Sequence, residues 1–405
     1  MRRGGARRAL RAERDPPGPS RSKGPHVSRR ASGPRIGLQP RPDGRRLAAR
    51  QRRAPRRLET HPARRRRPRA RHPQKFPVGK TCEVSGWSAW QPLADAPAFT
   101  REVLAETIDG GQAFRWHREP DDTCLGVWAE SVARIRLVGA RASGRQSEFT
   151  LEWSAPGDLA PRVATALPKY LGIDRDFAAL TDALPWRSDP HLARCIAEFR
   201  GLRILRQPVG ETLLGFLCSA TKQIVQIKQM MALLAERHGA VIVGRAGPLG
   251  PPPKERTAQR SVSTFHRLPT WPELAQIPEA TLRECQLGFR AKFIHQTAQF
   301  LAAHPGWLEE TETLPYPIAK ERLCSLPGVG EKIADCVLLF GAGRLEAFPV
   351  DTWILKALAR RYGLDDWKPA HVAQFGRAHF GPLAGLAQQF LFSYERRAAQ
   401  KSIVT

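Results

Sequence analysis

The sequence lacks the features that mark several classes of protein. Its 405 residues contain no run of 18 or more apolar residues, and the first 30 carry Arg, Pro and Gly where a secretory signal needs an apolar segment. The seven cysteines are scattered and none forms a C-x2-C pair, which argues against a disulfide framework and against a cysteine-rich zinc or iron–sulfur site. We therefore expect a soluble, intracellular protein that does not partner a membrane.

Aromatic residues are absent from the first 75 positions, and the positive charge is concentrated there. Residues 1–75 hold 24 Arg and 2 Lys against 4 acidic residues, whereas the remainder holds 39 basic and 34 acidic residues. A Pro-interrupted segment without aromatics cannot bury enough apolar area to offset its ordering entropy, so we expect disorder. Two interpretations stay open: an arm that adds sequence-independent affinity for polyanions, or a non-essential or spurious extension.

The rest of the chain changes pattern once. From Val103 to about Trp153, short runs alternate apolar and polar residues, which is typical of antiparallel strands. Beyond Leu159 the spacing is helical, with a start signal at 188–190, where Ser and Asp precede Pro. A Gly/Pro/basic stretch at 244–260 indicates a flexible insertion between helices.

These patterns predict an α+β fold in three parts. We expect a disordered arm at 1–75, a small antiparallel β domain at 76–175 and a large α-helical domain at 176–405.

The segment Leu326-Pro327-Gly328-Val329-Gly330 indicates a tight hairpin between two helices. We expect the first helix to end at Ser325 and the second to begin near Glu331. Gly328 and Gly330 let the backbone turn and approach another backbone, while the free N–H groups of the new helix can hold a phosphate. The pattern predicts a helix-hairpin-helix that grips the DNA backbone.

Lys332 and Asp351 are the candidate catalytic residues. A cation in the first turn of a helix opposes the positive end of the helix dipole, which favours the neutral, nucleophilic amine. Asp351 follows Pro349 and precedes an apolar helical run, so it can cap that helix and direct a carboxylate to the same cleft. An amine and a carboxylate beside a DNA-gripping hairpin favour attack at a sugar carbon. A lone Lys at such a position is more commonly a solvated side chain.

At this point the chain resembles a known family, the helix-hairpin-helix DNA glycosylases with a Gly/Pro-rich loop and an Asp, and within them the 8-oxoguanine DNA glycosylase/AP lyases. The similarity runs in collinear order from about Ile108 to Arg397. Besides the hairpin and the Pro-Val-Asp segment, it rests on Gly111–Trp116, Gly201–Gln207, Leu287–Lys292 and Gln388–Ser393.

The resemblance implies roles for individual residues. Lys332 matches the nucleophile that attacks C1′ and forms a Schiff base, and Asp351 matches the carboxylate that stabilises the charge on the sugar. Gly111 matches the glycine whose carbonyl accepts the N7–H that distinguishes 8-oxoguanine from guanine. The other substrate-binding matches are Cys336 and Phe392 around the flipped purine, Gln388 at its Watson–Crick edge, and Pro349. Each of these taken singly is also compatible with a turn or an ordinary core position.

The DNA-facing matches are less complete. Thr221 stands where the eukaryotic type has an Asn that fills the vacated stack, and Gln226 stands where an Arg contacts the orphaned cytosine. Phe289 and Arg290 match the wedge aromatic and the second Arg, and Gly328 and Gly330 match the hairpin. Because one of two cytosine-directed guanidiniums is missing, we expect relaxed discrimination of the opposite base.

We therefore expect a base-excision-repair enzyme that acts on damaged double-stranded DNA as a monomer, with no cofactor and no catalytic metal. It would work where the DNA is, in the cytoplasm or nucleoid of a bacterium or the nucleus of a eukaryote. The alternatives are a glycosylase for another damaged purine and a non-catalytic helix-hairpin-helix DNA-binding protein.

Overall fold

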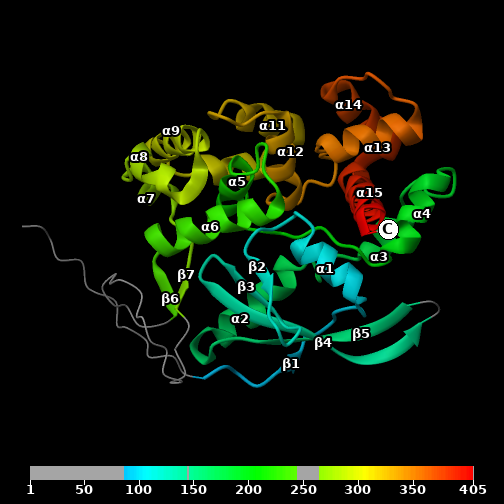
Figure 1. The fold of residues 1–405 in the computed structure, drawn as a ribbon, viewed down its shortest axis with the longest axis horizontal. Coiled ribbons are helices and arrows are strands. Elements are labelled where there is room, and N and C mark those ends of the chain that lie inside the picture. The colour runs from blue at the N-terminus through cyan, green and yellow to red at the C-terminus, as the bar shows by residue number, and fades with distance from the viewer. Residues whose placement is uncertain (1–85, 144–145, 244–263, 405) are drawn as a thin grey trace, which may run out of the picture. The chain divides into compact units, whose positions relative to one another are not determined.

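The computed structural model describes residues 86–143, 146–243 and 264–404, which all belong to one compact unit, Lys75–Thr405. The expected disordered arm at 1–75 and the expected insertion at 244–260 lie outside the described residues. Within the described part the α+β prediction is confirmed, because one antiparallel sheet is accompanied by a larger set of helices (Figure 1).

Five antiparallel strands form the sheet in the order β1-β5-β4-β3-β2. The register places Leu137 opposite Leu151, which sets the apolar face toward the core. On that face the Trp116 and Trp128 rings stack with centroids 5.7 Å apart, and the Trp116 indole donates a hydrogen bond of 3.1 Å to the Tyr170 hydroxyl. The strands are β1 (Gln91–Pro92), β2 (Trp116–Arg118), β3 (Cys124–Trp128), β4 (Ser131–Ser143) and β5 (Gln146–Ser154).

The strand pattern expected from Val103 onward is wrong at its start, where the chain forms helix α1 (Arg101–Asp109). The Thr100 hydroxyl oxygen accepts the Val103 N–H at 3.1 Å and caps the helix. Apart from Glu106, the buried residues of α1 share one helical face: Val103, Leu104, Thr107 and Ile108. The segment forms a helix and not a strand because its buried residues lie on one helical face and do not alternate along the chain.

The change to helices beyond Leu159 is confirmed. One start signal is confirmed in detail, since Asp189 Oδ1 accepts the N–H groups of His191 and Leu192 at 3.0 and 2.9 Å. The helices up to α8 are α2 (Ala160–Tyr170), α3 (Phe177–Asp182), α4 (Pro190–Glu198), α5 (Val209–Leu217), α6 (Ile224–His238), α7 (Trp271–Ala275) and α8 (Glu279–Leu282).

The later helices carry the hairpin and the end of the chain. They are α9 (Arg290–Ala303), α10 (Trp307–Thr313), α11 (Tyr316–Cys324), α12 (Glu331–Phe340), α13 (Thr352–Tyr362), α14 (Pro369–Phe380) and α15 (Ala384–Val404). Short 3-10 turns stand at Gly157–Leu159 and Gly381–Leu383, and a π-type turn at Arg283–Leu287. A two-stranded ribbon of β6 (Val241–Val243) and β7 (Phe265–His266), which the sequence did not predict, interrupts the helices.

Two features of this arrangement position the site. Helix α1 lies beside the sheet and next to α15, and the hairpin between α11 and α12 lies on the helical side (Figure 1).

Among the described helices, none combines the length and the apolar character needed to span a bilayer.

Candidate active site

The hairpin has the predicted boundaries. Helix α11 is followed by its C-cap Ser325, and α12 begins at Glu331 after its N-cap Gly330. Gly328 has a φ of 77°, and a Cβ on it would lie 2.6 Å from Cγ of Phe293 in α9, so only glycine fits this turn. Gly328 and Gly330 are exposed, and the first N–H groups of α12 have no intrahelical partner. The turn therefore offers backbone donors to a phosphate.

Lys332 lies in the first turn of α12 and is half-buried. Its Nζ is 3.4 Å from Oγ of Ser219 and 5.1 Å from the centroid of the Phe216 ring. The Ser219 hydroxyl donates to the Phe216 carbonyl at 2.7 Å, which leaves its lone pairs toward the ammonium. The amine thus contacts one hydroxyl, one aromatic face and the Cys336 thiol, and among the described residues no carboxylate forms an ion pair with it.

Asp351 is the N-cap of α13, as predicted. Its Oδ1 accepts the N–H groups of Trp353 and Ile354, both at 2.9 Å. Burial raises the pKa of the Asp351 carboxyl, while the Ile354 N–H and the charge of Lys332 oppose that rise. The structure thus brings the two candidate catalytic residues within electrostatic reach of one another.

A second buried carboxylate stands on α12, but its oxygens are occupied. Asp335 accepts the Tyr316 hydroxyl at 2.8 Å and forms an ion pair with Lys320 at 3.0 Å. Because both of its oxygens are bound within the fold, Asp335 supports the α11–α12 packing. Both cap hydrogen bonds of Asp351 go to its Oδ1, so neither of them occupies its Oδ2.

Cys336 lies one turn after Lys332 and is buried. Burial raises the pKa of its thiol to about 12, against a smaller opposing effect of the Lys332 charge. The thiol therefore stays neutral. Pro349 is buried two residues before Asp351.

Gly111 follows the end of α1 and has a φ of 106°, a conformation that glycine adopts at no steric cost. A Cβ on it would lie 3.2 Å from Cδ1 of Ile224 and 4.0 Å from Cε1 of Phe392. On its other side, Gln112 is tied to the 203–207 segment by hydrogen bonds of 2.7 to 2.9 Å. Gly111 and Phe392, 281 positions apart, therefore lie close together.

Gln388 lies one turn before Phe392 on α15 and is buried. Its Oε1 has no hydrogen-bond partner among the described residues. A buried amide oxygen without a partner costs free energy unless a ligand satisfies it. Gln388 is therefore available to read the edge of a bound base.

The chain matches known proteins along most of its described length. Residues 99–213 match the model of the 8-oxoguanine DNA glycosylase N-terminal domain, and residues 215–378 match that of the HhH-GPD superfamily of base excision DNA repair proteins. The N-glycosylase/DNA lyase of Arabidopsis thaliana is 29% identical over 335 residues, covering 79% of this chain and 84% of the relative. That of Saccharomyces cerevisiae is 30% identical over 284 residues, covering 64% of this chain and 68% of the relative.

A solved structure gives the same result. The 8-oxoguanine glycosylase/lyase of Clostridium acetobutylicum, bound to double-stranded DNA with cytosine opposite 8-oxoguanine, is 30% identical, with a TM-score of 0.62 and coverage of 73% of this chain and 92% of that chain. The chain belongs to the 8-oxoguanine N-glycosylase/DNA lyase family. The 3-methyladenine DNA glycosylase of Archaeoglobus fulgidus, at 20% identity and a TM-score of 0.55, shares the fold alone.

The DNA-facing candidates of the enzyme fall into two groups. Phe289 is 53% exposed and packs edge-on against Phe293 at 6.3 Å, so it projects from the start of α9. Arg290 is buried, and its guanidinium donates to the carbonyls of Ala220 and Leu287 and, at 3.0 Å, to Oγ1 of Thr221.

Arg290 and Gln226 therefore have structural partners in this conformation. The guanidinium of Arg290 supports the 220–221 turn, where Thr221 has a φ of 56°. The Gln226 side chain accepts the Gln223 N–H at 3.2 Å as part of the α6 cap. Neither side chain projects freely in the way that Phe289 does.

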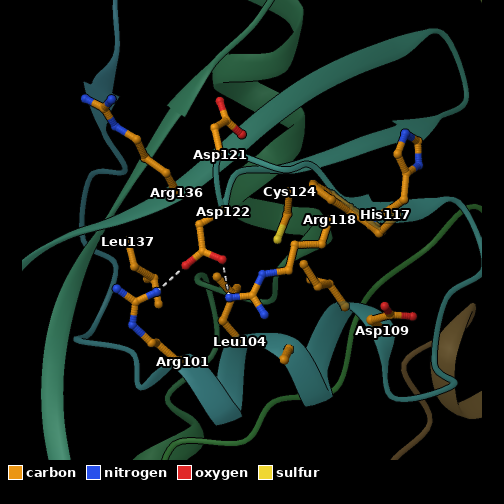
Figure 2. Close-up of a pocket in the computed structure, with 13 residues that line it drawn as sticks. Arg101, Leu104, Asp109, His117, Arg118, Asp121, Asp122, Cys124, Arg136 and Leu137 are labelled. Atoms are coloured by element: carbon orange, nitrogen blue, oxygen red, sulfur yellow. Dashed lines mark hydrogen bonds and ion pairs between the residues drawn. The ribbon is translucent and has the colours of Figure 1, made fainter.

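A pocket of about 350 Å³ between α1 and strands β2 to β4 contains none of the predicted site residues (Figure 2). Asp122 in this pocket pairs with both Arg101 and Arg118, so these side chains already have an ionic partner within the protein. Among the described residues no group of His, Cys, Asp and Glu could hold a metal ion.

Sequence reasoning missed three residues that shape the site. Ser219 and Phe216 contact Lys332, and Ile224 is the nearest side chain to Gly111. Phe216 lies in α5, Ser219 in the turn after it and Ile224 at the start of α6, and none of these positions carried a chemical signal of its own.

Proposed function

We propose that the enzyme excises 8-oxoguanine from double-stranded DNA and then cleaves the strand at the abasic site. The observation that carries the proposal is the convergence of Lys332 and Asp351 behind a hairpin with free backbone donors. Membership of the family supports it, and the pocket residues Gly111, Gln388 and Phe392 supply a place for the base.

The reaction begins with extrusion of the damaged nucleotide, which costs a few kcal/mol of unstacking. The amine of Lys332, once it has given up its ammonium proton, attacks C1′ as the bond from C1′ to N9 of the base breaks. The base leaves with the bonding electrons and takes up the proton that the attacking nitrogen sheds when the C1′–N bond forms. The carboxylate of Asp351 stabilises the positive charge that develops on the sugar. Ser219 and Phe216 hold the amine in position before the attack.

Strand cleavage follows from the covalent intermediate. Opening of the sugar ring gives a Schiff base between C1′ and Nζ of Lys332. Loss of a proton from C2′ then expels the 3′ phosphate by β-elimination, and water releases the lysine.

Lesion recognition falls to the walls of the pocket. The Gly111 carbonyl accepts the N7–H of 8-oxoguanine, which guanine lacks, and the unpartnered Oε1 side of the Gln388 amide faces the base edge. Phe392 and the neutral thiol of Cys336 enclose the purine faces, with Pro349 beside them.

The enzyme contacts the base opposite the lesion more weakly than a family member that has both cytosine-directed arginines. Phe289 fills the gap left by the flipped base together with Thr221, and the hairpin glycines Gly328 and Gly330 hold the backbone. Arg290 is engaged by backbone carbonyls and Gln226 by its own helix cap. We infer relaxed selectivity for the base opposite the lesion.

The remaining features are proposed with the function. The enzyme acts as a monomer on DNA without a cofactor, in the compartment that holds the DNA, cytoplasm or nucleoid in a bacterium and nucleus in a eukaryote. Its domains are 76–175 and 176–405, with the first family match extending to residue 213.

The test is cleavage of otherwise identical duplexes holding 8-oxoguanine, guanine or an alkylated purine, with separate measurement of free base and of nicked strand. The proposal requires release of 8-oxoguanine and a nick. Release of another purine instead would favour the glycosylase of different specificity, and binding without release would favour a non-catalytic DNA-binding protein.

A further inference from the structure

The position of Gly111 depends on helix α1, which ends two residues before it. The N–H of Gly110 still bonds to the Glu106 carbonyl at 3.0 Å, so the last turn of α1 leads directly into Gly111. Because Gly111 joins this turn to Gln112, which is anchored to the 203–207 segment, a shift of α1 displaces or tilts the Gly111 carbonyl.

Part of helix α1 borders an open pocket on the side of the sheet. The pocket of about 350 Å³ lies between it and strands β2 to β4, and Leu104 and Asp109 line that pocket from the helix (Figure 2). At the other end of α1, Arg101 is held by Asp122. The apolar face of α1 is buried in the core, and polar contacts at the ends of the helix add to that packing in setting its position.

One such contact crosses to α15. Nη2 of Arg396 lies 2.5 Å from Oε2 of Glu106, although the two residues are 290 positions apart. Their side chains are only 20% and 8% exposed, so water screens the pair weakly. The pair therefore holds the last turns of α1 against α15.

The same guanidinium also contacts the opposite wall of the base pocket. The Cζ of Arg396 lies 5.9 Å from the centroid of Phe392, one turn earlier on α15. A second pair, Asp109 with Lys228, ties the end of α1 to α6, the helix whose first residue, Ile224, lies nearest to Gly111. Both walls that face Gly111 are thus linked to α1 by an ion pair.

We propose that Arg396 and Glu106 are specificity-determining positioning residues, which with the Asp109–Lys228 pair fix the Gly111 carbonyl at one distance from Phe392. This inference rests on the proposed function, since it concerns how the pocket selects 8-oxoguanine. A hydrogen bond to N7–H weakens steeply when the acceptor moves or tilts, so a small shift of α1 lowers base excision. An abasic site has no base to position, so the lyase step on it does not depend on the pair.

The experiment compares single-turnover release of 8-oxoguanine with the lyase rate on a preformed abasic site in the same duplex. The variants are Arg396→Gln and Glu106→Gln, with Arg396→Lys as the conservative change. Glu106→Gln keeps the size of the side chain and leaves a cation that can reach water, so it tests the proposal even where Arg396→Gln fails to fold.

The matched control is Arg397→Gln. Arg397 is the next residue on α15, pairs with Glu198 of α4 at 3.4 Å and lies 5.6 Å from the Phe199 ring, so it makes the same kinds of contact without touching α1. It reports what loss of an equivalent pair does to the enzyme in general.

We expect both Gln variants to lower base release by about 10- to 100-fold with a lyase rate within about twofold of wild type, and Arg396→Lys and Arg397→Gln to keep the wild-type ratio. Equal losses in both steps, or an unchanged ratio in folded Glu106→Gln, would overturn the proposal. A wild-type enzyme that releases no 8-oxoguanine would overturn the proposed function as well, which separates the two failures.

Discussion

The substitution Gly328→Ala tests the hairpin most sharply. Gly328 has a φ of 77°, and the added Cβ would stand 2.6 Å from Cγ and 2.7 Å from Cβ of Phe293. These atoms lie at the root of an aromatic side chain on α9, so they cannot swing away as the end of a flexible chain could. Either the hairpin or Phe293 must therefore move.

The expected cost has two parts. A left-handed conformation costs an alanine about 1–2 kcal/mol relative to glycine, and overpacking of a fixed neighbour costs about 1–3 kcal/mol. We expect the free energy of unfolding to fall by about 2–5 kcal/mol. Because Phe293 packs against Phe289 at 6.3 Å, the projecting Phe289 shifts too, and affinity for lesion-bearing duplex falls with stability.

Denaturant unfolding measures the stability change, and fluorescence anisotropy with a duplex holding an uncleavable abasic analogue measures the affinity. Gly330→Ser is the matched control, since Gly330 has a φ of −96°, nothing lies within 4 Å of its Cβ position, and serine suits an N-cap. A Gly328→Ala protein as stable as wild type, or a Gly330→Ser protein equally destabilised, would refute the steric reasoning.

Three further predictions concern charge and selectivity. Asp351→Asn keeps a cap oxygen for Trp353 and Ile354, so the fold persists while base release falls by about 10²–10³-fold. Since burial raises the pKa of Asp351, wild-type release declines with acid at a higher pH than an ordinary Asp would give, as a rate–pH profile would detect. Burial raises the pKa of Glu211 from its ordinary 4.5 to about 7, so its contribution to stability is present below about pH 4.5 and lost as the pH rises through about 7. Between about pH 5 and about pH 8, the free energy of unfolding should therefore fall by roughly 1–3 kcal/mol less in Glu211→Gln than in wild type. An equal fall in both proteins, measured by denaturant unfolding at the two pH values, would contradict this. Competition between duplexes should give a preference for cytosine opposite the lesion of less than about tenfold, and a strong preference would show that Arg290 leaves its carbonyl partners on binding.

Local signals in the sequence were sufficient for the hairpin and the caps. Gly328 and Gly330 mark a turn because few other residues fit it, and Asp351 and Asp189 precede helices whose N–H groups they accept. Each of these features is set by residues within a few positions of one another, which is why spacing alone predicted them.

Tertiary contacts decided the parts that the sequence did not predict. Helix α1 was mistaken for strand because its buried face becomes evident only against the sheet and α15. The guanidinium of Arg290 donates a hydrogen bond to the carbonyl of Ala220, which is 70 positions away in the sequence. Glu106 likewise pairs with Arg396, which is 290 positions away. No local pattern encodes such pairs, so residue type alone could not assign their roles.

The central claim is that Lys332 is the nucleophile, and borohydride trapping on a duplex with one 8-oxoguanine tests it most directly. Wild type, Lys332→Gln and a control, Lys356→Gln, are compared at equal protein; Lys356 is an exposed lysine on α13. We predict a covalent protein–DNA adduct with wild type and Lys356→Gln and none with Lys332→Gln, because borohydride reduces only a Schiff base formed on the reacting amine. An adduct of undiminished yield with Lys332→Gln, or none with wild type bound to the same duplex, would contradict the account.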